Sequence, residues 1–189
     1  MTESSYKLRM MIVSALFAAI IGVFAQVTIP LPLVPITGQT LAIGLAATIL
    51  GARYGTLSVL LYLCMGAIGI PVFAQMSGGL GSLFGPTGGF LFGFLPTAFI
   101  IGYFLEKAGF TLKSAIIANV VGMFVALSFG TVWLKFFANL TWTAAFAGGF
   151  APFILVGLIK ATLAAWAGIT VRNRLKSTIL LTAWSAQVK

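Results

Sequence analysis

Residues 114–134 read SAIIANVVGMFVALSFGTVWL, and Lys113 and Lys135 stand at the two ends of this uncharged stretch. A helix rises about 1.5 Å per residue, so about 20 apolar residues cross the roughly 30 Å hydrocarbon core of a bilayer. The stretch therefore predicts a transmembrane helix. The whole chain of 189 residues is 60% hydrophobic and only 7% charged, whereas a soluble domain is about a quarter charged. This composition predicts a membrane protein.

Further apolar runs lie on both sides of this stretch. The six predicted spans are residues 8–27, 37–50, 54–70, 90–105, 113–136 and 150–172. The second is short for a span, so we expect it to be tilted, buried or continued by the proline-rich residues before it, which cannot form a regular helix. The sequence thus predicts an all-α membrane protein with six transmembrane helices in a single domain, residues 1–176. Residues 177–189 are too short to span again and are predicted to be a short cytoplasmic tail.

The basic residues indicate which side of the membrane each segment faces. If both termini are cytoplasmic, the inner segments contain nine of the 11 Lys and Arg residues: Lys7, Arg9, Arg53, Lys107, Lys113, Arg172, Arg174, Lys176 and Lys189. The outer segments 28–36, 71–89 and 137–149 contain none. This positive-inside distribution predicts a multi-pass protein of the cell membrane with both termini inside. Because topology explains the net charge of +9, we expect no nucleic-acid partner.

The outer segment 71–89 has no charge and contains SGGLG at 77–81 and GPTGG at 85–89. So much glycine argues against a regular helix, yet the segment is too apolar for an ordinary solvated loop. Non-helical backbone at membrane depth is tolerated only where it packs against protein or lines a cavity. We therefore expect a lid or re-entrant loop that folds over a pocket.

The composition excludes most kinds of catalytic and metal-binding site. The chain has two acidic residues, both Glu, with no His, no Asp and one Cys. Carboxylate dyads, Ser-His-Asp triads and metal sites lack their residues, so we predict no enzyme, metal or cofactor. There is also no phosphate-binding P-loop, so an ATP-driven step requires a partner.

Lys160 is the candidate for a binding function, because it lies about ten residues into the last span, near the predicted bilayer midplane. An intramembrane cation costs roughly 2.5–3.5 kcal/mol on insertion scales, and both Glu3 and Glu106 are predicted on the cytoplasmic side. Either the amine is neutral or bonded to backbone carbonyls, or it is the counter-ion of an acidic ligand. Lys135, by contrast, is expected to snorkel to the outer interface.

Other polar and small residues in the spans each fit two interpretations. The uncharged polar residues Gln39, Thr40, Ser58, Tyr62, Asn119 and Ser128 can line a pocket or join helices. Ala15 and Ala19, with Ala18 and Gly22 beside them, have the small-xxx-small spacing that lets another helix approach closely. That helix can belong to this fold or to a partner.

Several motifs are specific when taken together. They are LGARYG at 50–55, Tyr62, GIPVFA at 69–74, SGGLG at 77–81, GPTGGF at 85–90, and Lys160 followed by Ala164 and Ala165. Over nearly the whole chain, these residues resemble the BioY family. Proteins of that family are the biotin-specific membrane subunits, or S components, of energy-coupling factor (ECF) transporters. The resemblance implies a six-helix fold that captures biotin from outside. It also implies two kinds of partner, a transmembrane coupling subunit and two ATPase subunits.

The resemblance also implies roles for individual residues. Ala15 and Ala19 would dock on the coupling subunit, and Lys160 would hold the valerate carboxylate of biotin. The Gly-rich segment would cover the bicyclic ring. The candidate substrate-binding residues are Lys160, Gln39, Tyr62, Ser77, Gly85, Thr87 and Asn119. In the family an Asp normally stands three positions before this lysine, whereas this chain has Gly157.

Two other functions remain open at this point. One is a self-sufficient facilitator or channel, which uptake by the chain without ATPases would favour. The other is a structural or assembly protein without a ligand, which a flat titration with biotin would favour.

Overall fold

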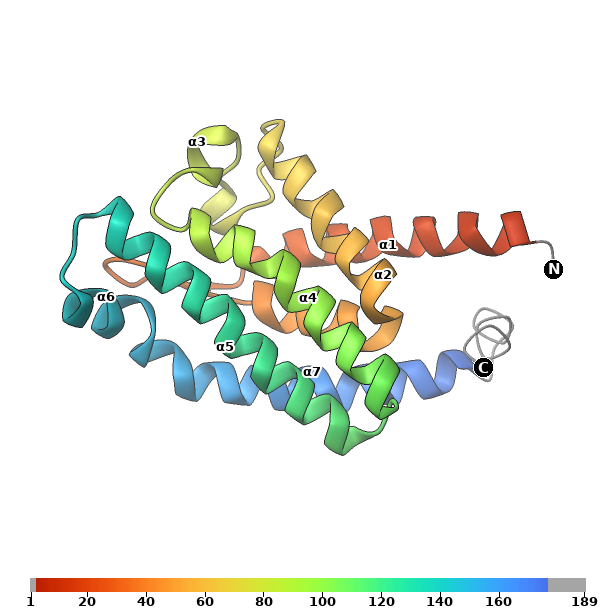
Figure 1. Cartoon of the computed structure of the whole chain (residues 1–189). Helices are drawn as coiled ribbons and strands as arrows, with labels where there is room; N and C mark the ends of the chain where they lie inside the picture. The colour runs from red at the N-terminus through yellow and green to blue at the C-terminus, as the bar shows by residue number, and fades with distance from the viewer. Residues whose placement is uncertain (1–2, 177–189) are drawn as a thin grey trace.

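The computed structural model describes residues 3–176 as long helices that run alongside one another, with short elements gathered at one end (Figure 1). The elements are α1 (Glu3–Ala25), β1 (Thr28–Ile29), β2 (Ile36–Thr37), α2 (Gln39–Ala67), η1 (Ala74–Met76), α3 (Leu80–Leu83), α4 (Gly88–Ala108), α5 (Leu112–Phe137), α6 (Trp142–Gly149) and α7 (Ala151–Lys176). Five helical stretches, with α6 counted together with α7, are long and apolar enough to cross a membrane. The predicted all-α membrane class is confirmed. The predicted tail, residues 177–189, lies outside the described residues.

α2 consists of two helical segments, residues 39–50 and 52–67, that fold back on each other at Gly51 (Figure 1). Gly51 has φ 82° and ψ −173°, a backbone conformation that glycine adopts without steric penalty. Nε2 of Gln39 lies 2.5 Å from the hydroxyl oxygen of Tyr62, although a straight helix would separate these residues by roughly 35 Å. The two segments correspond to the predicted second and third spans, but α2 counts as one of the five stretches that are long and apolar enough to cross a membrane, so six separate spans remain a prediction.

The fold-back requires close approach of helix backbones. A Cβ added at Gly55 would lie 2.7 Å from the Cα of Ala47 in the first segment of α2. A Cβ added at Gly102 in α4 would overlap the backbone of Ala52. Glycine at these two positions therefore lets both segments of α2, and α4, meet at the junction.

Two charged side chains stabilise the same junction. The backbone N–H of Ala52, which begins the second segment, donates to Oε1 of Glu106 at 2.8 Å. At the end of the first segment, the guanidinium of Arg172 donates to the carbonyl of Ile49. The guanidinium carbon also lies 3.4 Å from the ring centroid of Phe110. An anion at a helix N-terminus and a cation at a C-terminus are both favourable. Arg172 is only 1% exposed, so the interpretation of this residue as an inner-surface charge missed its packing role.

The basic residues gather at one end of the bundle. The start of α1, the α2 junction, the α4–α5 connection and the end of α7 lie at that end (Figure 1). Of the basic residues that the structure describes, only Lys135 and Lys160 lie away from these segments. The arrangement agrees with the predicted inner face, and the sidedness itself remains a prediction.

The opposite end carries the short elements. β1 and β2 form an antiparallel hairpin in which Thr28 pairs with Thr37, and the proline-rich residues 30–35 form its turn. The Gly-rich segment 71–89 is mostly irregular, as expected, although it contains η1 and the single turn of α3. α6 was not predicted, because it begins after Thr141 in a segment expected to be an outer loop. The hydroxyl of Thr141 accepts a hydrogen bond from the backbone N–H of the first turn of α6, so it is a helix N-cap.

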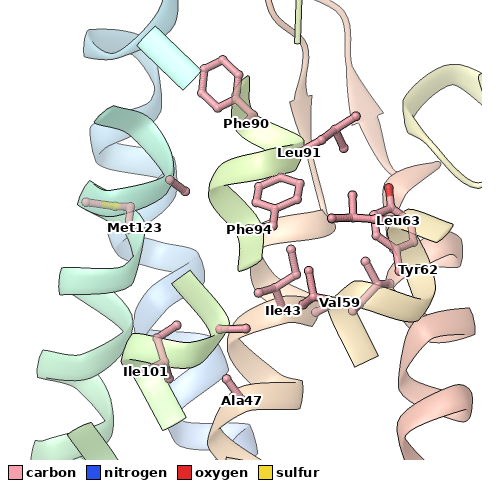
Figure 2. Packing of buried hydrophobic residues seen from close by; sticks show 14 of the residues in the cluster. Ile43, Ala47, Val59, Tyr62, Leu63, Phe90, Leu91, Phe94, Ile101 and Met123 are labelled. Carbon is pink, nitrogen blue, oxygen red and sulfur yellow. The ribbon is translucent and has the colours of Figure 1, made fainter. Parts of the chain in front are cut away.

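The core lies between α2, α4 and α5, where apolar side chains from the three helices interlock. Figure 2 shows Ile43, Ala47, Val59, Tyr62 and Leu63 of α2, Phe90, Leu91, Phe94 and Ile101 of α4, and Met123 of α5. Four of these residues, Phe90, Leu91, Phe94 and Met123, also line the cavity described next. The core thus continues directly into the wall of the cavity.

Candidate functional site

A cavity of about 320 Å³ lies where the long helices meet the short elements. Its lining includes the proline-rich turn, through residues 31–35, and the Gly-rich segment, through Phe73, Ala74, Gln75, Ser77, Ser82, Pro86 and Thr87. Its remaining walls come from β2 and from four of the long helices, through Thr37, Gln39, Thr40, Phe90, Leu91, Phe94, Met123, Ala126, Leu127, Phe153, Gly157 and Lys160. A mostly apolar cavity of this size with a few polar groups is typical of a small-molecule site.

Lys160 projects from α7 into this cavity and is half-buried. Its Nζ donates to the backbone carbonyl of Thr37 in β2 at 2.7 Å. An ammonium group has three donors, so it can keep this bond and still bind an anion. Within residues 3–176, no acidic side chain lines the cavity. The bond to Thr37 agrees with the interpretation that Lys160 binds a backbone carbonyl. Its position in the cavity is the one that a counter-ion of an acidic ligand requires.

Gln39, the first residue of α2, also lines this cavity. Its Oε1 accepts from Oγ1 of Thr37 at 2.6 Å, and its Nε2 donates to the Tyr62 hydroxyl at 2.5 Å. Tyr62 does not reach the cavity, because it is fully buried behind Gln39. Its ring lies edge-on to Phe73, with the centroids 5.5 Å apart. Tyr62 therefore fixes two residues of the cavity wall.

The other predicted contacts separate into two groups. Ser77 and Thr87 line the cavity. Gly85 does not line it, and its carbonyl accepts from Nε1 of Trp133 at 2.9 Å, which ties the Gly-rich segment to α5. Asn119 also lies away from it.

Asn119 joins two helices instead. Its Nδ2 donates to Oγ1 of Thr48 in α2 at 3.0 Å and to the carbonyl of Ala115 at 2.9 Å. The side chain is almost fully buried. Of the two interpretations of this residue, joining helices and lining a pocket, the structure shows the first.

Sequence reasoning missed most of the apolar wall. Phe90, Phe94 and Phe153 line the cavity, but aromatic residues on a membrane helix have the same pattern whether they face a cavity, a neighbouring helix or lipid. Gly157 also lines it, and a Cβ at this position would overlap Sδ of Met123. An aspartate, which the resemblance leads us to expect at this position, would therefore displace Met123 here.

The two small-residue faces of α1 point in different directions. Ala18 is fully buried, and a Cβ at Gly22 would lie 3.2 Å from Cβ of Val72, so this face packs within the fold. Ala15 and Ala19 are exposed. The Ala15–Ala19 face is therefore available to another helix.

Comparison with known proteins decides the family, because residues 1–177 match the BioY family. The chain belongs to this family. It is 45% identical over 172 residues to the biotin transporter BioY2 of Lactococcus lactis subsp. cremoris (strain MG1363), which covers 91% of this chain and 94% of that protein. It is 39% identical over 166 residues to the biotin transporter BioY of Thermotoga maritima, covering 88% and 97% of the two chains.

The fold of this BioY-family chain also matches a solved structure. The crystal structure of the S component for biotin from an ECF-type ABC transporter superposes with a TM-score of 0.82 at 31% identity, covering 92% of this chain and 95% of that one. The family and its named relatives are transporters rather than enzymes. With its membrane-spanning helices, the chain is a multi-pass protein of the plasma membrane.

Proposed function

We propose that this chain binds biotin from the outer side of the membrane as the substrate-capture subunit of an ATP-driven ECF importer. The observation that carries the proposal is Lys160, which is the one cationic side chain lining the cavity among residues 3–176. Relatives named as biotin transporters and the fold shared with a biotin S component support biotin as the substrate.

The chemistry of biotin fits the distribution of groups in the cavity. The valerate carboxylate pairs with the ammonium of Lys160, because a charge-assisted hydrogen bond is roughly twice as strong as a neutral one. The apolar chain and ring contact the aromatic wall. Gln39, Ser77 and Thr87 offer polar groups to the ureido ring, and the Gly-rich segment covers it.

The proposed transport step needs partners. The chain has no phosphate-binding loop, so a coupling subunit and two ATPase subunits supply the energy for release to the inside. The proposal treats residues 1–176 as a single transmembrane domain and residues 177–189 as a short cytoplasmic tail. Uptake in cells that carry ATPase subunits with inactive P-loops tests it: we expect binding without uptake. Uptake at the normal rate would instead support a self-sufficient facilitator.

The Ala15–Ala19 face of α1 is the proposed docking surface for the coupling subunit. We expect the double variant Ala15→Leu and Ala19→Leu to reduce ATP-dependent uptake by about tenfold or more, because large side chains prevent close helix approach. The biotin Kd of the isolated chain is expected to stay unchanged, since both positions are exposed. Thr162→Leu, which enlarges an exposed residue of α7, is the control. Normal uptake by the double variant would contradict this assignment.

Tyr62 is proposed to act on biotin through Gln39. We expect Tyr62→Phe to weaken biotin binding by about fivefold, because one hydrogen bond contributes about 1 kcal/mol and the freed amide of Gln39 loses its fixed orientation. Asn119→Ala is the matched control: it also removes buried hydrogen bonds, but away from the cavity. We expect it to lower the Tm in detergent and leave the Kd within about twofold of the wild-type value. Equal Kd changes in the two variants would contradict the role of Tyr62.

A further inference from the structure

The carboxamide of Gln26 joins α1 to the wall of the cavity. This residue directly follows α1. Its Nε2 donates to the carbonyl of Phe73 at 3.0 Å and to the carbonyl of Gly22 at 3.1 Å. Its Oε1 accepts from the backbone N–H of Met76 at 2.9 Å. The side chain of Gln26 thus donates to and accepts from the backbone of one short segment, residues 73–76.

Residues 73–77 have a backbone that needs such support. Gln75 and Met76 have φ of 58° and 55°, in the left-handed region that residues other than glycine rarely adopt, so the surrounding structure must hold them there. Phe73, Gln75 and Ser77 all line the cavity. A ligand that fills the cavity therefore contacts a strained turn.

This turn is held from two directions. From α2, the ring of Phe73 packs edge-on against Tyr62, and a Cβ at Gly66 would overlap that ring. From α1, Gln26 binds its backbone at two points, and Gly22 packs beside Val72. A displacement of residues 73–77 is therefore transmitted to the end of α1.

The same helix carries the exposed Ala15–Ala19 face. Ala19 and Gln26 are seven positions apart, roughly 10 Å along a helix, so a rigid helix connects the turn to this face. We propose that Gln26 is a positioning residue that couples occupation of the cavity to docking of the Ala15–Ala19 face on the coupling subunit. This inference rests on the proposed function.

Thermodynamic linkage defines the measurement, because biotin must change the docking affinity by the same factor as docking changes the biotin affinity. The full chain in nanodiscs is titrated with the complex of coupling subunit and ATPases, with and without saturating biotin. The ratio of the two docking Kd values is the coupling ratio. For the wild-type chain we expect it to differ from unity by about fivefold or more.

Three variants test the residue. Gln26→Met keeps the length but removes every hydrogen bond, and we expect its coupling ratio to fall within about twofold of unity while docking without biotin is unchanged. Gln26→Glu keeps the acceptor for Met76 and is expected to give an intermediate ratio. If Gln26→Met fails to fold, Gln26→Asn, whose amide is one methylene shorter, replaces it with the same expected loss. Thr28→Val is the control: it removes a hydrogen bond to Ala25 at the same end of α1 and is expected to keep the wild-type ratio.

One result would overturn the inference while biotin still binds, namely a wild-type coupling ratio in Gln26→Met. An equal loss of docking in that variant with and without biotin gives this same ratio, and it is the effect of a purely structural role. A wild-type chain that does not bind biotin at all would instead overturn the proposed function, and with it the basis of this inference.

Discussion

Lys160→Ala is expected to weaken biotin binding by about 10- to 150-fold, because a hydrogen bond to a charged group contributes about 1.5–3 kcal/mol. The ammonium of Lys160 lines the cavity and is held at the carbonyl of Thr37, where it is already oriented before a ligand arrives. The Kd of the purified chain for radiolabelled biotin measures the effect. Lys160→Arg keeps the charge and is expected to recover part of the affinity.

The lysine also bonds to β2, so its loss can disturb the cavity without any role as a counter-ion. Biotin methyl ester separates the two effects, because it is larger by only one methyl group and has no carboxylate. A counter-ion role predicts that Lys160→Ala weakens biotin and leaves the ester unchanged. Equal weakening of both ligands would show that Lys160 acts only through the hairpin, and that the carboxylate assignment is wrong.

Arg172→Met is expected to produce the largest loss of stability. A hydrogen bond to a charged group contributes about 1.5–3 kcal/mol, and Arg172, which is 1% exposed at the junction of α2, donates to the carbonyl of Ile49 and packs on the ring of Phe110. Its loss leaves the carbonyl of Ile49, at the end of the first segment of α2, without this donor. For a chain of this length, about 3 kcal/mol corresponds to a Tm lower by roughly 6–12 °C.

The control for Arg172 is two residues away on the same helix. Arg174 is exposed, so Arg174→Met removes the same charge from the same end of α7 without opening the junction. We expect its Tm in detergent to stay within about 2 °C of the wild-type value. Equal Tm values for the two variants would contradict the role of the junction. A stable Arg172→Met variant inserted in the opposite orientation would show that this charge acts only through topology.

The membrane class and the helices could be predicted because hydropathy and length determine them locally. The break between the second and third spans was also predictable from LGARYG at 50–55. The close packing of the two segments was not, because Gly55 and Gly102 reveal their contacts only once α2 and α4 are packed. α6 was missed because eight residues, Trp142–Gly149, are too few to stand out in a hydropathy pattern.

The site was predictable only in part, for a different physical reason. A polar residue in a span can face a cavity or a neighbouring helix, and helical spacing alone does not distinguish these directions. Gln39 reaches the cavity, whereas Asn119 binds Thr48 in a neighbouring helix. Arg172 was counted with the inner-surface charges because the positive-inside rule uses position along the chain, and burial depends on which helices meet there.

The most direct test of the central claim is a titration of the purified wild-type chain with radiolabelled biotin, in competition with unlabelled biotin or biotin methyl ester. Saturable binding at one site per chain, displaced by biotin far better than by the ester, is the expected result. A flat titration, or equal displacement by both competitors, would contradict a biotin site built around Lys160.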